Sequence, residues 1–243
     1  AFPERFEKQK NILDNNPKIG LVTCQYEGIN NEGEFIGSQK RTIKPSDSQV
    51  RTFFRNYIPH SSVLMRTSVL PQPVYNVDCA AEDFDLWMKL ARTTNFFIVP
   101  EILMKLRNKQ GSLGEVNKEN IARSHKNIIK DKLLELEINP TEQEVEFHYN
   151  YEKKNNYNTL EAQLILCYFE KLFASNKKKR IFREEPFALF LFNNWYHVLK
   201  YTNKLTLSLI KQILSAKLTY YKKGKLVLLI KIFIKKGLLN QFN

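Results

Sequence analysis

In the first 115 positions, segments whose apolar residues have the spacing of a helix alternate with segments whose spacing is typical of short strands. Residues 4–15 have a helical spacing that ends before Pro17, because proline disfavours helix in the residue before it. The same reading predicts helices over 4–15, 48–56 and 82–92, and strands over 19–26, 34–37, 61–66, 96–100 and 103–107. Short strands mixed with helices predict an α/β layer.

From Val116 onward the spacing is helical throughout. It predicts helices over 117–137, 141–154, 158–175, 185–201, 204–222 and 225–236. Thr141 and Glu144 have the spacing of a capping box, and Pro186 falls in the first turn of its helix. The fold class expected is therefore α/β, a mixed sheet with helices over residues 1–115, followed by an all-α region over residues 116–243.

The predicted helix 204–222 has a narrow lysine-bearing face and a wide apolar one. Such a helix suits the plane of a membrane surface and suits the core of a bundle equally well. Residues 226–234 are apolar almost all round, but this stretch is shorter than the roughly 20 apolar residues that a membrane span needs.

The net charge of +13 is concentrated near the end of the chain. No Asp or Glu follows Glu185, whereas ten lysines do. One-sided charge predicts an anionic partner, and we expect an anionic membrane surface. The sequence shows no zinc-ligand spacing, no RNP-like aromatic motif and no helix-turn-helix signature, which argues against nucleic acid as the partner. Three scattered cysteines fit a reducing compartment.

The segment Ala80–Leu90 carries the clearest candidate chemistry. Glu82, Asp83 and Asp85 stand at the start of a predicted amphipathic helix. Acidic side chains stabilise helix N-termini, so a structural role explains them. The alternative is that one carboxylate is a general base aimed into a cleft.

The surrounding motifs resemble those of a known family. A His60-Ser61-Ser62 stretch enters a strand about twenty residues before Glu82-Asp83, which Asp85-Leu86-Trp87 follows. A strand with a basic loop, from Leu106 to Ser112, comes about twenty residues later. In this order, and with Phe2–Gln9 and Asn16–Val22 before them, these motifs resemble the second half of the family 2 glycosyltransferases, which are inverting enzymes of GT-A fold.

The resemblance implies roles for individual residues. Asp83 would be the general base and Glu82 its supporting acid. His60, Ser61 and Trp87 would line the acceptor or donor-sugar site, although core packing is the favoured explanation of Trp87 and a structural role that of His60. Arg107, Lys109 and Ser112 would bind the diphosphate, although a role in the turn explains Ser112 equally well. Lys109 stands where the family has a histidine, and lysine is a poor metal ligand.

The resemblance also implies a cofactor and a setting. Mg²⁺ or Mn²⁺ is expected, held by residues upstream of residue 1, because the chain begins just after the place of the family's Asp-x-Asp motif. We expect such a fragment to be inactive alone and to hold no metal ligands.

The expected whole enzyme transfers a hexosyl group from a nucleotide-diphosphate sugar to a glycan or lipid-linked acceptor. It would serve bacterial cell-envelope polysaccharide synthesis, in the cytoplasm at the inner face of the membrane. A non-catalytic adaptor that binds a membrane or a partner through the basic helices is the alternative.

Overall fold

The computed structural model describes residues 1–39, 42–108, 113–150, 154 and 156–217. It divides the chain into two compact units, residues 1–129 and 130–243. The first unit holds α1 (Arg5–Asn15), β1 (Ile19–Ile29), β2 (Phe35–Gln39), η1 (Pro45–Asp47), α2 (Ser48–Phe54), η2 (His60–Ser62), β3 (Leu64–Met65), η3 (Thr67–Val69), α3 (Glu82–Leu90), β4 (Asn95–Arg107) and α4 (Leu113–Val116). The boundary between the units falls within α5 (Lys118–Glu135), and α6 (Glu142–Asn150), α7 (Thr159–Lys179), α8 (Glu184–Lys200) and α9 (Leu207–Ser215) follow.

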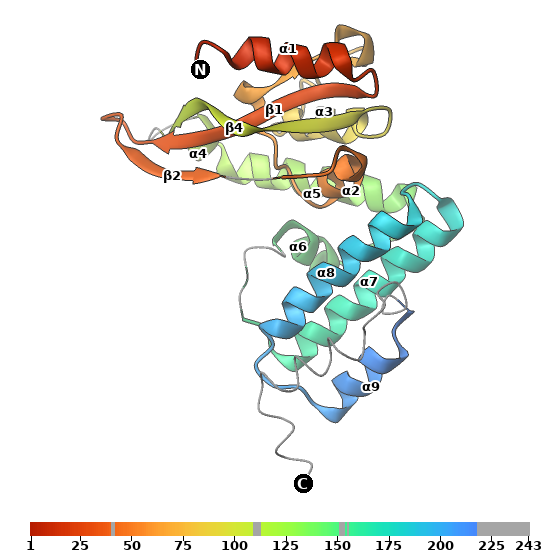
Figure 1. The fold of residues 1–243 in the computed structure, drawn as a ribbon. Coiled ribbons are helices and arrows are strands. Elements are labelled where there is room, and N and C mark those ends of the chain that lie inside the picture. Colours follow the sequence, from red (N-terminus) through yellow and green to blue (C-terminus); the bar gives the residue numbers. More distant parts are fainter. Residues whose placement is uncertain (40–41, 109–112, 151–153, 155, 218–243) are drawn as a thin grey trace. The chain divides into compact units, whose positions relative to one another are not determined.

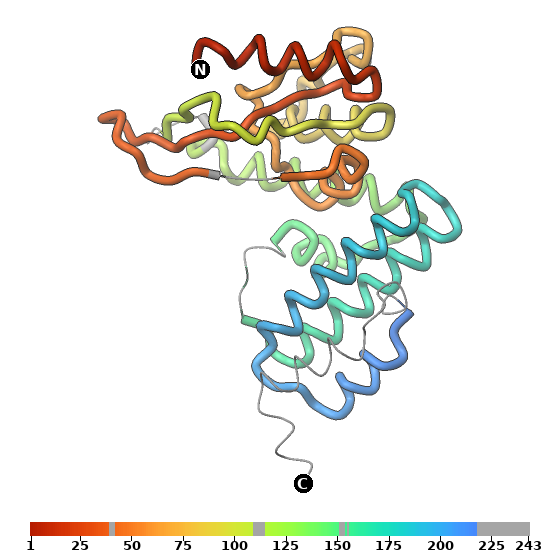
Figure 2. Tube along the Cα trace, in the orientation of Figure 1, coloured from red at the N-terminus to blue at the C-terminus, as the bar shows by residue number. Residues whose placement is uncertain are grey.

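The sheet is built around β1. β4 pairs with β1 in parallel along its whole length, and β2 and β3 pair with it antiparallel at opposite ends of its other edge. Figure 2 shows the chain passing through β1 and later, in the same direction, through β4 beside it. The expected α/β class, with a mixed sheet followed by a helical region, is confirmed.

Both faces of β1 are covered, so its apolar residues alternate between two cores. Leu21 points to a cluster that includes residues of α3, whereas Val22 and Cys24 belong to a cluster that includes Leu13 of α1. This alternation follows from the two-residue period of a strand. The sheet therefore lies between α1 and α3, and Figure 1 shows α1 running along β1.

Two glycines meet specific geometric demands in this sheet. A Cβ on Gly20 would lie 2.5 Å from the side-chain oxygen of Thr94, so a larger residue near the start of β1 would have to displace this threonine. Gly33 has a φ of +90° in the turn between β1 and β2, a conformation that side chains disfavour.

Some predicted boundaries in the first unit are wrong for identifiable reasons. The two strands expected over 96–100 and 103–107 are one strand, β4, with a bulge at Pro100 and Glu101 where the pairing with β1 skips two residues. Proline has no N–H to donate, and a bulge accommodates it without ending the strand. The strand expected over 61–66 shrinks to β3, because Ser62 Oγ donates to Pro59 O at 2.6 Å and closes the tight turn η2.

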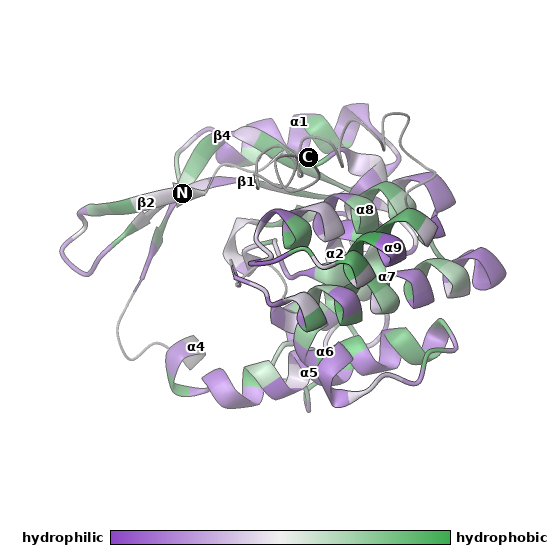
Figure 3. Cartoon of the chain, turned by 90° about the horizontal axis from the view of Figure 1, so that it is seen from below, coloured by the Kyte–Doolittle hydropathy of each residue, from purple (hydrophilic) through white to green (hydrophobic). Residues whose placement is uncertain are grey.

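The second unit is helical, and α8 combines a buried apolar face with polar residues, seen as green and purple segments in Figure 3. The capping box predicted before α6 is confirmed, since Glu144 N donates to Thr141 Oγ1 at 3.2 Å and Thr141 N donates to the Glu144 carboxylate at 2.8 Å. Pro186 lies in the first turn of α8, as predicted.

The helix predicted over 204–222 is shorter in the structure. Thr206 Oγ1 accepts from Leu209 N and begins α9, and the extended backbone of Ala216 ends it after Ser215. Leu209 and Ile213 are buried, and α9 contacts α7. The described part of this helix therefore packs in the bundle. Residues 218–222 and the predicted helix 225–236 lie outside the described residues. No helix in the described ranges is both long and apolar enough to cross a membrane.

Candidate functional site

The carboxylate of Asp83 is anchored through one oxygen. Asp83 is the second residue of α3 and is half-buried. Its Oδ1 accepts hydrogen bonds from Asn56 Nδ2 at 3.2 Å and from the Phe84 N–H at 2.6 Å. Among the residues that the structure describes, Oδ2 has no hydrogen-bond partner. One oxygen thus fixes the carboxylate while the other stays available to a proton donor.

The segment between α2 and η2 runs beside the first turns of α3. Asn56 meets Asp83, and four residues later the His60 ring lies edge-on to Trp87, with 5.7 Å between ring centroids. Residues four apart share a helix face, so Trp87 lies one turn beyond Asp83 on the same side of α3. The fold therefore brings His60 and Asp83, two predicted site residues, along one face of α3.

His60 and Ser61 are exposed, so their side chains are accessible to a substrate. His60 Nε2 and Tyr75 Oη form a hydrogen bond of 3.0 Å, in which the donor depends on the histidine tautomer. The carbonyl of Ser61 accepts from Arg5 Nη1 at 2.8 Å, so α1 holds this turn by its backbone. The roles of His60 and Ser61 in sugar binding stay predictions.

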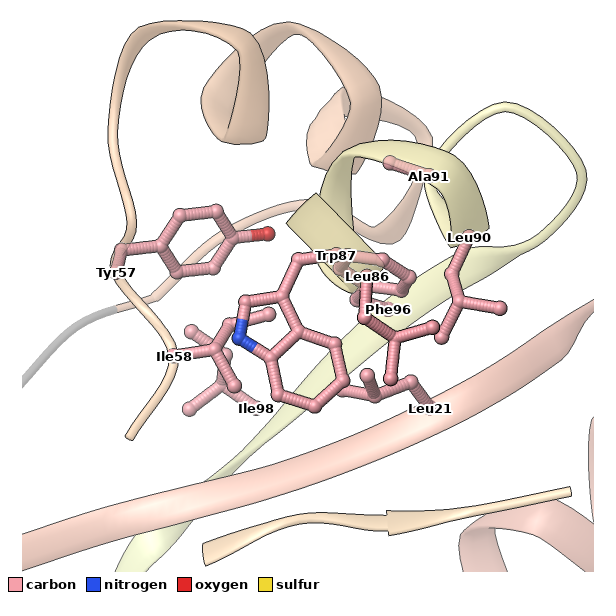
Figure 4. Close-up of a cluster of buried hydrophobic side chains, with 9 residues drawn as sticks. All are labelled: Leu21, Tyr57, Ile58, Leu86, Trp87, Leu90, Ala91, Phe96 and Ile98. Carbon is pink, nitrogen blue, oxygen red and sulfur yellow. The ribbon is translucent and has the colours of Figure 1, made fainter. Parts of the chain in front are cut away.

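Trp87 is completely buried, at 0% exposed. Figure 4 shows its indole among Leu21, Ile58 and Ile98, which belong to the core cluster between α3 and the sheet. Its indole nitrogen has no hydrogen-bond partner within the described residues. This placement matches the core-packing interpretation of Trp87, and its edge contact with His60 is its one ring contact with a predicted site residue.

The other two acids of the segment behave differently from Asp83. Asp85 forms an ion pair with Lys89, with Oδ2 and Nζ 2.6 Å apart. The carboxylate of Glu82 is partly exposed and has no hydrogen bond or ion pair in the described part of the chain. Ala81, the residue before the helix, makes no side-chain cap hydrogen bond. The acidic side chains of the first turn therefore also stabilise its unpaired N–H groups. The structural role and the candidate base role coexist in Asp83.

The predicted diphosphate-binding residues are only partly described. Arg107 ends β4, and its Nη1 donates to the carbonyls of Asn30 at 2.7 Å and Asn31 at 2.6 Å. These bonds hold the turn between β1 and β2. Lys109 and Ser112 lie outside the described residues.

Divalent-cation ligands are not assembled in the described ranges, where no group of three or more His, Cys, Asp or Glu side chains is placed to hold a metal. Within the described ranges there is thus no such set of ligands for Mg²⁺ or Mn²⁺. The expectation of such an ion rests on the family resemblance alone.

Two residues that the sequence did not single out complete this site. Asn56 bonds the candidate base and Tyr75 bonds His60. Neither has a signal in the sequence, because each lies 15 or more residues from its partner and the contacts arise only from the fold.

The second unit has a separate cavity of about 740 Å³. It lies between α6 and α7, and its lining is mostly apolar, including Phe147, Leu160 and Leu164. No predicted site residue lines it.

Comparison with known proteins gives one informative match. The sequence matches no protein-family model. It is 25% identical over 126 residues to an uncharacterised glycosyltransferase of Methanocaldococcus jannaschii, and the match covers 50% of this chain and 43% of that protein. The chain thus matches less than half the length of this relative. The similarity supports the coarser part of the sequence-based expectation, which is a glycosyltransferase; the inverting family 2 class and the hexosyl donor stay predictions.

Proposed function

We propose that this chain contributes the acceptor side of an inverting glycosyltransferase. The enzyme would transfer a hexosyl group from a nucleotide-diphosphate sugar to a glycan or lipid-linked acceptor. The observation that carries the proposal is the state of Asp83, whose carboxylate is anchored through Oδ1, while Oδ2 has no hydrogen-bond partner among the described residues. The similarity to a glycosyltransferase supports glycosyl transfer as the reaction that this carboxylate would assist.

The proposed reaction is a single displacement. Asp83 Oδ2 takes the proton of the acceptor hydroxyl as its oxygen bonds to the anomeric carbon. The bond from that carbon to the diphosphate oxygen breaks, and the electron pair leaves with the nucleoside diphosphate. Attack opposite the leaving group inverts the anomeric centre. A positioned base contributes about 10²–10⁴-fold to such a step.

Other residues of the site have supporting roles in this proposal. Glu82, without a protein partner in the described chain, orients an acceptor hydroxyl. The exposed side chains of His60 and Ser61 contact a sugar bound beside Asp83. Arg107 and the basic loop after it offset the charge that grows on the diphosphate.

We also propose that the basic C-terminal region docks the enzyme on the inner, anionic face of the cell membrane. Ten lysines and no acids after Glu185 support this location. The full chain should sediment with phosphatidylglycerol-containing vesicles at 50 mM salt and release them at 500 mM, because exposed charges are screened by salt. Equal binding to neutral phosphatidylcholine vesicles would contradict an electrostatic anchor.

The activity is tested on the protein as its gene encodes it. UDP- and GDP-linked hexoses are supplied with a membrane-lipid extract, and release of nucleoside diphosphate is followed. The anomeric configuration of the product is then read by NMR. Inversion is expected, whereas a product that retains the donor configuration would refute the proposed displacement. Vesicle binding without turnover of any donor would favour the non-catalytic adaptor.

A further inference from the structure

The bond between Asn56 and Asp83 joins two elements that are distant in sequence. Asn56 lies two residues after the end of α2 and 27 residues before Asp83. Its neighbours fix it on both sides, since Phe54 before it and Tyr57 and Ile58 after it are buried. Packing of these neighbours therefore holds the backbone that carries the Asn56 amide.

The orientation of this amide is determined by charge. Nδ2 points at Asp83 Oδ1, and a flipped amide would place an oxygen against the carboxylate. Oδ1 already accepts from the Phe84 N–H, so the two donors together fix the plane of the carboxylate. Oδ2 is then the oxygen that has no donor among the described residues.

The placement of Asn56 is poor for stability alone. Its own Oδ1 is buried and has no partner within the described residues, which is an unfavourable state for an amide oxygen. Such local disagreements with stability are expected where a residue serves a site.

We infer that Asn56 is a positioning residue that holds Asp83 so that Oδ2 takes the proton of the acceptor hydroxyl. This inference rests on the proposed function, because it needs Asp83 to be the base. It adds the identity of the reacting oxygen and the residue that selects it. A positioning residue affects the chemical step through Asp83 and leaves substrate binding unchanged.

The test compares Asn56→Ala, Asp83→Asn and the double variant in the donor-turnover assay. Asn56→Ala should lower kcat about 10-fold at unchanged donor KM, since misplacing a catalytic group costs up to about 10²-fold. In the Asp83→Asn background the same substitution should have no further effect, because residues that act through one another are not additive. Asn56→Asp keeps the shape of the side chain but places a second carboxylate against Asp83, so it should lower kcat further.

Asn194→Ala is the matched control, because it removes another half-buried amide, one that donates to Phe190 O at 2.7 Å in the second unit. It should leave kcat unchanged. Equal losses from Asn56→Ala in the wild-type and Asp83→Asn backgrounds would overturn the positioning role and leave the proposed base intact. Wild-type turnover by Asp83→Asn would overturn the proposed base, and the inference with it.

Discussion

Replacing Trp87 with alanine distinguishes a core residue from a wall of the acceptor site. The side chain is 0% exposed, so the substitution removes a fully buried aromatic group. An aromatic side chain buries about 150–250 Å², which at about 25 cal/mol per Å² corresponds to about 4–6 kcal/mol. Its indole N–H is buried without a partner in the described chain, and losing it recovers part of that free energy. We therefore expect a loss of about 3–5 kcal/mol in the free energy of unfolding of the first unit.

Native-state hydrogen exchange at the β1 and β4 amides measures this loss directly, because these strands form the centre of the sheet. Trp87→Phe is the control, since it keeps a ring in the cluster and should cost less. A Trp87→Ala protein that loses under about 1 kcal/mol while its acceptor KM rises would refute the core assignment. It would restore Trp87 as a wall of the acceptor site.

Two further predictions follow from described contacts. Arg107→Ala removes the donors that hold the carbonyls of Asn30 and Asn31; amide exchange in this turn should accelerate, and a raised donor KM with an unchanged exchange rate would instead indicate a purely diphosphate-binding role. Burial, with the nearby Lys200 charge, lowers the pKa of His197. As pH falls, His197 therefore becomes protonated in the unfolded chain before it does in the folded one. The stability that His197 contributes is present above its ordinary pKa of about 6.5, and it is lost as pH falls through the lower pKa of the folded state. Denaturant unfolding from pH 7.5 to 5 should show a shallower loss of stability for His197→Gln, and identical slopes would contradict this pKa shift.

The sequence predicted elements well where local signals agree with packing. α1 ends where Pro17 requires, and α6 begins at the capping box of Thr141 and Glu144. It failed where the tertiary structure decides. β4 continues through Pro100 because parallel pairing with β1 resumes beyond the bulge. α9 stops at Ser215 although its apolar pattern continues, because the backbone of Ala216 is extended.

The candidate site, like the fold, could be predicted from the sequence only in part. Asp83 could be proposed from the sequence, since its neighbours form a motif in one short segment. The partner that orients it could not, because Asn56 comes from a loop whose path beside α3 is set by the burial of Tyr57 and Ile58. For Arg107 the motif suggests a phosphate-binding residue, but in the structure its guanidinium donates to two backbone carbonyls.

The central claim is that Asp83 is the general base, and substitution of two neighbouring acids tests it most directly. Asp83→Asn and Asp85→Asn make the same chemical change two residues apart, but Asp85 forms an ion pair with Lys89, whereas Oδ2 of Asp83 has no partner among the described residues. In the donor-turnover assay, Asp83→Asn should lower kcat by about 10² or more. Asp85→Asn should stay close to wild type, because an i,i+4 ion pair contributes only about 0.3–0.5 kcal/mol to stability. Equal turnover by Asp83→Asn and the wild-type protein would contradict the account.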